Sequence, residues 1–171
     1  MKKRILAALA AAAAALSLLS ACGEGVVDPN AASNQSAVSE AVSSALQESD
    51  VEDSLSGLES YMLSQGYISG AAAQMNGSLI GALEEGHRYV ANGVTAEFYQ
   101  YDLENLSDTA NAVRASVEEN GTFEIVGQTI SGVYLSDSGK YLMIYQNSAA
   151  DKESQAKTQA AIEAFQSFKS E

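Results

Sequence analysis

The dipeptide Asn92-Gly93 constrains the fold of this chain more than any other short stretch of the sequence. It stands between the runs 87–90 and 95–101, which contain the aromatic and β-branched residues that are typical of strands. Both central residues of a type I′ turn have positive φ, a conformation that Asn and Gly adopt readily. The dipeptide therefore predicts a β-hairpin formed by these two runs.

A second hairpin is predicted between the runs 130–135 and 140–145. The cluster Ser136-Asp137-Ser138-Gly139 separates them and has the composition of a turn. Residues 122–126 are expected to form a further strand. Two hairpins next to each other in one chain favour an antiparallel sheet.

Apolar residues at helical spacing predict three helices in the same part of the chain. Two of them start at Ser, Asn or Asp caps, and two end at a Gly that accepts the left-handed conformation. The helices are expected from near Val51 to Gln65-Gly66, from a cap at Asn105 or Ser107 to Asn120-Gly121, and from Asp151 to Lys169.

The resulting order of elements is α-β-β-α-β-β-α. It predicts an α+β fold, with a small, mainly antiparallel sheet made of two hairpins and with helices packed on one face. Residues 79–82 are expected to belong to the same strand as 87–90, interrupted by a bulge or turn. The small, Gly-rich stretch 68–78 is not assigned.

The N-terminus has the basic segment, apolar run and small residues of an export signal, in that order. Residues 2–4 are basic, residues 5–19 are apolar apart from one Ser, and Leu19-Ser20-Ala21-Cys22 ends the stretch. This tetrapeptide resembles the lipobox of bacterial lipoproteins. The resemblance implies cleavage before Cys22 and acylation of its thiol. A transmembrane helix is the alternative, but the run is shorter than the roughly 20 residues that a span usually needs.

On this interpretation the chain has three parts: a lipoprotein signal peptide (1–21), an acylated Cys22 with a flexible Ser- and Ala-rich tether (22–50), and one globular domain (51–171). The tether has no aromatic residue and cannot bury enough apolar surface to offset its ordering entropy. Residues 38–46 have some helical spacing, so the tether could be partly helical. The expected location is the outer, extracytoplasmic face of the cell membrane, with Cys22 as the attachment.

Acidic residues dominate the charge of the processed chain. Cleavage removes three of the nine basic residues, which leaves six against 22 acidic ones and a formal net charge of −16. Such a surface repels the phosphates of nucleic acids, so no nucleic-acid partner is expected. A single His and a single Cys exclude most metal sites and any disulfide within the chain. No metal and no cofactor are expected.

Five short stretches of the domain give a second resemblance, to small uncharacterised lipoproteins of Gram-positive anaerobes. The similarity extends over about residues 55–168, and it implies the compartment and the fold but brings no known activity. The stretches are Ile80-Gly81-Ala82, Gly86, Asn92-Gly93, the run from Glu97 to Asp102, and Asn120-Gly121-Thr122-Phe123.

His87 is the natural candidate for a catalytic base, because it is the only His of the chain. A base needs a nucleophile and an orienting carboxylate. The carboxylates close in sequence are Glu84 and Glu85, on a turn that water is expected to reach. We therefore expect no catalytic residue, and we expect His87→Gln to fold normally. The alternative function is a cell-envelope hydrolase or transferase that uses carboxylates and His87.

Tyrosine is the compositional peculiarity of the domain, since the chain has eight Tyr and no Trp. Tyr99, Tyr101, Tyr141 and Tyr145 all lie on predicted strands. If they shared one exposed face of the sheet, they would form a platform for a protein partner or a small ligand. The alternative is that Tyr, a good strand former, covers a half-buried sheet. The sequence thus predicts a non-enzymatic binding module whose ligand it does not identify.

Overall fold

The computed structural model describes residues 45–170. The lipobox, Cys22 and tether residues 23–44 lie outside this range. The helices are η1 (Glu48–Asp50), α1 (Leu55–Ser64), η2 (Gly77–Ile80), α2 (Asp108–Asn120) and α3 (Lys152–Ser167). The strands are β1 (Ala73–Asn76), β2 (Glu85–Ala91), β3 (Val94–Gln100), β4 (Thr122–Ile125), β5 (Gln128–Ser131), β6 (Val133–Leu135) and β7 (Tyr141–Asn147).

The strands form a five-stranded antiparallel sheet in the order β1-β2-β3-β7-β6 and a separate two-stranded hairpin, β4-β5. The α+β fold class is confirmed. Both predicted hairpins are present as β2-β3 and β6-β7. Asn92 and Gly93 have φ values of 53° and 80°, as a type I′ turn requires.

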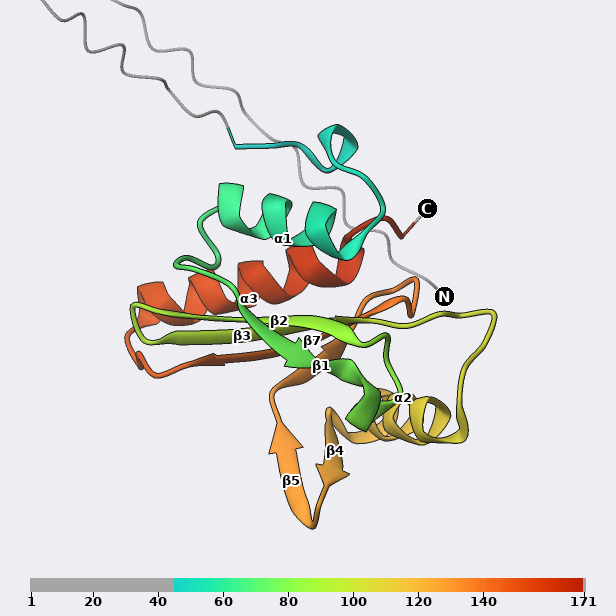
Figure 1. The fold of residues 1–171 in the computed structure, drawn as a ribbon. Coiled ribbons are helices and arrows are strands. Elements are labelled where there is room, and N and C mark those ends of the chain that lie inside the picture. The colour runs from blue at the N-terminus through green and yellow to red at the C-terminus, as the bar shows by residue number, and fades with distance from the viewer. Residues whose placement is uncertain (1–44, 171) are drawn as a thin grey trace, which may run out of the picture. The chain divides into compact units, whose positions relative to one another are not determined.

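Helices cover both faces of the sheet, whereas the sequence predicted them on one face (Figure 1). On one face, α1 and α3 pack over side chains such as Phe98, Tyr141 and Met143. On the other face, α2 and the β4-β5 hairpin cover Tyr99 and Leu142. The expectation failed because the central strands β3 and β7 are apolar on both faces, and each apolar face has to be covered.

Side-chain caps start the three α-helices. The side-chain oxygens of Ser54, Ser107 and Asp151 accept hydrogen bonds from the backbone N–H three residues later, at 3.1, 3.1 and 2.9 Å. Ser107 rather than Asn105 therefore caps α2, and the Asp151 cap of α3 is confirmed. Residue 121 ends α2 in the left-handed conformation, as its Gly predicted.

Two predicted strands are interrupted. Gly132, with a φ of 70°, divides the run 130–135 into β5 and β6, and a Cβ there would lie 2.8 Å from the carbonyl oxygen of Tyr145. Residues 79–82 are not strand: Leu79 and Ile80 form the second half of the 3₁₀ turn η2, and Gly81 caps it in the left-handed conformation. The unassigned stretch 68–78 contains the edge strand β1.

Contacts begin before residue 51, within the stretch assigned to the tether. The Leu46 N–H donates to the Ser64 hydroxyl at 3.1 Å, and the Gln65 amide donates to the Leu46 carbonyl at 2.7 Å. The Lys169 N–H donates to the Glu48 carboxylate. Residues 46–50 thus contact the end of α1 and the C-terminal residues.

Candidate functional site

The four tyrosines of the predicted platform are buried, so that prediction is wrong. Tyr99, Tyr101, Tyr141 and Tyr145 are at most 5% exposed. The register of β3 and β7 pairs Tyr99 with Leu142 and Tyr141 with Gln100. Because the side-chain period of a strand is two, this register turns Tyr99 and Tyr141 to opposite faces of the sheet.

The hydroxyls of these tyrosines are engaged inside the fold. Tyr99 donates to Glu97 at 2.7 Å, and Tyr145 donates to the carbonyl of Tyr67 at 2.9 Å. Burial raises the pKa of Tyr101 to about 12, although the positive charge of Arg114 acts in the opposite direction. These groups stabilise the core and present no tyrosine surface to a ligand.

His87 has an orienting carboxylate that sequence reasoning missed. Its Nδ1 lies 2.7 Å from Oε1 of Glu59, which projects from α1 and is only 5% exposed. The Tyr89 hydroxyl donates to the other oxygen of Glu59 at 3.0 Å. Burial, followed by the charge of Glu59 and this hydrogen bond, raises the pKa of Tyr89 far above its usual value. Glu59 therefore has a partner on each oxygen.

The second nitrogen of His87 faces another carboxylate. Its Nε2 lies 3.5 Å from Oε1 of Glu85, whose side chain is 70% exposed. A general base in an acyl-transfer centre faces a nucleophilic hydroxyl or thiol at this position. The arrangement is that of a His bridging a buried and an exposed carboxylate.

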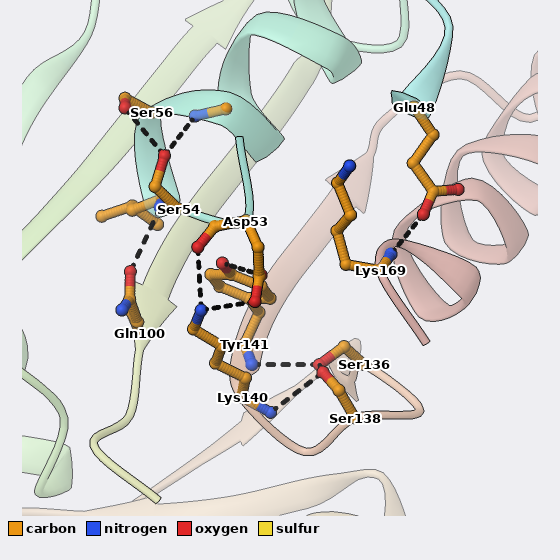
Figure 2. A network of polar contacts seen from close by, with 12 residues as sticks. Glu48, Asp53, Ser54, Ser56, Gln100, Ser136, Ser138, Lys140, Tyr141 and Lys169 are labelled. Carbon is orange, nitrogen blue, oxygen red and sulfur yellow. Dashed lines mark hydrogen bonds and ion pairs between the residues drawn. The ribbon is translucent and has the colours of Figure 1, made fainter. Parts of the chain in front are cut away.

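A polar network joins the chain before α1 to the start of β7 (Figure 2). Asp53 accepts from the Lys140 ammonium at 2.7 Å and from the Tyr141 hydroxyl at 2.7 Å. Partial burial raises the pKa of the Asp53 carboxyl, but these two hydrogen bonds and the Lys140 charge outweigh it, so this pKa lies below its ordinary value. The network ties η1 and α1 to the sheet, and its charges are already paired.

The turn 136–139 separates this network from a cleft at the β6 edge of the sheet. The Ser136 hydroxyl oxygen accepts from the Tyr141 N–H at 3.0 Å and lies 3.0 Å from the Ser138 hydroxyl (Figure 2). On the other side, the Asp137 N–H donates to the Gln166 carbonyl at 2.8 Å. These bonds hold the turn between β7 and the end of α3, so the cleft has a fixed wall.

Arg114 is the cationic residue of this cleft, which has a volume of about 490 Å³. The guanidinium carbon lies 5.8 Å from the centre of the buried Tyr101 ring, within the range of a cation–π contact. The Arg114 Nη2 also lies so close to Gly139 that a Cβ at this position would collide with it. The remaining lining comes from α2, β6, the turn 136–139 and α3.

The Arg114 guanidinium has no carboxylate partner among residues 45–170. Arg88, Lys140 and His87 each lie within 4 Å of an acidic side chain there, and Arg114 does not. Its Nε is buried and has no hydrogen-bond partner in the described part of the chain. In a chain with 22 acidic and nine basic residues, a guanidinium without a partner needs an explanation.

Sequence reasoning missed both Glu59 and Arg114, although each carries a signal. Residues 110, 113, 114 and 117 occupy the inward-facing positions of α2, and Arg114 is the charged one among Ala110, Val113 and Val117. Glu59 has the same position among the inward-facing residues 55, 58 and 62 of α1. A charge on the apolar face of a helix marks a group that needs a partner.

The chain matches no protein-family model, no curated protein and no solved structure. Among the described residues, no three His, Cys, Asp or Glu side chains are grouped in a way that could hold a metal ion. In the same range, none of the helices has both the length and the apolar character to span a membrane.

Proposed function

We propose that this chain is a membrane-anchored extracytoplasmic lipoprotein whose domain binds a ligand and does not catalyse a reaction. The lipobox-like tetrapeptide ending at Cys22 supports the anchor and the location. The cleft of Arg114 is the binding site of this proposal. The Arg114 guanidinium, which has no carboxylate partner among residues 45–170, is the observation that carries it, since a planar fork of N–H donors matches a carboxylate or phosphate oxygen pair.

The charge of the cleft favours a carboxylate over a phosphate as the group bound by Arg114. Glu118 and Asp137 also line the cleft, and they would repel a dianionic phosphate more than a singly charged carboxylate. His87 supports the non-enzymatic part of the proposal, because both of its ring nitrogens lie near carboxylates. The cleft and His87 are therefore assigned separate roles: binding for the first and stabilisation of the fold for the second.

Calorimetric titration of the full chain in detergent tests the binding site. The probes are L-leucine and 4-methylpentanoate, which share a carboxylate and a branched apolar tail. At least one should bind the wild type, and Arg114→Gln should raise its Kd by about tenfold or more through loss of charge-assisted hydrogen bonds. Arg88→Gln is the matched control, since Arg88 is paired with Glu97 at 3.4 Å outside the cleft. Failure of both probes to bind would refute the assignment.

Metabolic labelling with an alkyne fatty acid tests the anchor. The wild type should carry the label and partition into the detergent phase, and Cys22→Ala should do neither. A Cys22→Ala protein that still carries the label would contradict the proposal.

A further inference from the structure

We infer that the ligand of the Arg114 cleft is a zwitterion of the amino acid class, bearing an ammonium group beside the carboxylate that Arg114 binds. This inference rests on the proposed function and specifies its ligand. The acidic side chains of the cleft support it, because a simple carboxylate ligand would leave them without a cationic partner.

Glu118 is the first of these acidic groups. It follows Arg114 by four residues on α2, so the two side chains leave the same face of the helix from neighbouring positions. An Arg and a Glu at this spacing commonly form an ion pair, yet no pair within 4 Å joins them. The guanidinium lies instead over Tyr101 and against Gly139. The lining of the cleft thus includes a cationic and an anionic residue of one helix that are not paired with each other.

Asp137, in the turn 136–139, is the second acidic residue that lines the cleft. Its backbone is fixed by the hydrogen bond from its N–H to Gln166, and its side chain is exposed. With Arg114 and Glu118, it gives the cleft one positive and two negative groups. A ligand with only a carboxylate satisfies Arg114 but gains repulsion from both acids. A ligand with an adjacent ammonium group converts that repulsion into attraction.

The apolar part of the lining would receive the side chain of such a ligand. Tyr134 and Leu135, both partly exposed, line the same cleft, whereas Val117 and Val133 in its lining are at most 6% exposed. Charged groups beside a smaller apolar area suit a small polar ligand that carries an apolar tail. Its volume of about 490 Å³ accommodates an amino acid with a branched apolar side chain.

The experiment compares three ligands that share one carbon skeleton. L-leucine carries both charges, 4-methylpentanoate lacks the ammonium group, and 3-methylbutylamine lacks the carboxylate. Calorimetric titration of the full chain in detergent should give the lowest Kd for L-leucine, with Kd values about tenfold or more higher for the other two. The variant Glu118→Gln should raise the Kd of L-leucine and leave the Kd of 4-methylpentanoate equal or lower. Glu119→Gln, at the next position of α2 and outside the cleft lining, is the matched control.

The outcomes separate this inference from the proposed function. If 4-methylpentanoate binds as tightly as L-leucine and both depend on Arg114, the carboxylate site stands and the zwitterion inference is overturned. If neither Glu118→Gln nor Asp137→Asn reduces the preference for L-leucine over 4-methylpentanoate, the inference is likewise overturned. If no ligand binds, the proposed function falls with it. The melting temperature of each variant shows whether the fold is intact.

Discussion

Replacing His87 with Ala should destabilise the domain, because it removes one of the two partners of a buried carboxylate. Glu59 is 5% exposed and is paired with Nδ1 of His87 at 2.7 Å and with the Tyr89 hydroxyl at 3.0 Å. A hydrogen bond to a charged group contributes about 1.5–3 kcal/mol to the free energy of unfolding. The side chain of His87 is 21% exposed, so water can reach part of the space it leaves, which keeps the loss within this range.

A loss of that size is easily measured in the full chain. For a domain of this length, about 1.5–3 kcal/mol corresponds to a fall in melting temperature of roughly 5–15 °C. Urea unfolding followed by circular dichroism gives the free energy directly. Val90→Thr is a matched control on the same strand, since Val90 is 61% exposed and should change stability by less than about 0.5 kcal/mol.

A double-mutant cycle identifies the interaction that is lost. Glu59→Gln and His87→Ala should be coupled, because His87→Ala costs less once the carboxylate is absent. A His87→Ala protein within about 0.5 kcal/mol of the wild type would refute the reasoning and agree with the expectation from sequence that a substitution at His87 leaves the fold intact.

Three further predictions concern a cap, a titration and a close contact. Ser107→Ala removes the hydrogen bond to the Ala110 N–H and should cost about 1 kcal/mol in urea unfolding. The pKa of Asp53 is lowered in the folded state, so the contribution of its carboxylate to the free energy of unfolding is complete above the ordinary pKa of 3.8. This contribution is lost as the pH falls through the folded pKa. Asp53→Asn should therefore make the melting temperature less sensitive to acid in that pH range. Gly77→Ala places a Cβ against the carbonyl oxygen of Leu83 and should destabilise by about 1–3 kcal/mol, measured in the same way.

Local signals in the sequence predicted the parts of the fold that local chemistry determines. The Asn92-Gly93 turn and the Asp151 cap depend on backbone conformations and hydrogen bonds within a few residues, and both are present. The faces of the sheet depend on register between strands, which connects residues more than 40 positions apart, such as Tyr99 and Leu142. Strand propensity contains no information about that pairing, so the tyrosines were assigned to one face although they occupy two.

The candidate site depends on the same kind of long-range pairing. Glu59 and His87 belong to α1 and β2, and they become partners only when that helix packs on that strand. The cleft of Arg114 needs α2, β6 and α3 together. What the sequence does contain is a charged residue at the third of four inward-facing positions in α1 and again in α2. Such a position predicts that a partner exists but not which residue or ligand provides it.

The double variant Tyr99→Ala, Tyr141→Ala distinguishes a core role of the tyrosines from a surface role. The two side chains are 5% and 0% exposed and belong to separate clusters on opposite faces of the sheet. Truncation of a buried aromatic residue costs about 3–5 kcal/mol, and two truncations with few shared contacts roughly add to about 6–10 kcal/mol.

A domain of this size has a total stability of about 5–15 kcal/mol, so the double variant should lose its cooperative unfolding transition or show it at a much lower temperature. Each single variant should retain the transition at a reduced temperature. Near-UV circular dichroism and thermal melts of the full chain provide the measurement. A double variant that melts like the wild type would mean that neither tyrosine supports a core, and that the faces of the sheet are assigned incorrectly.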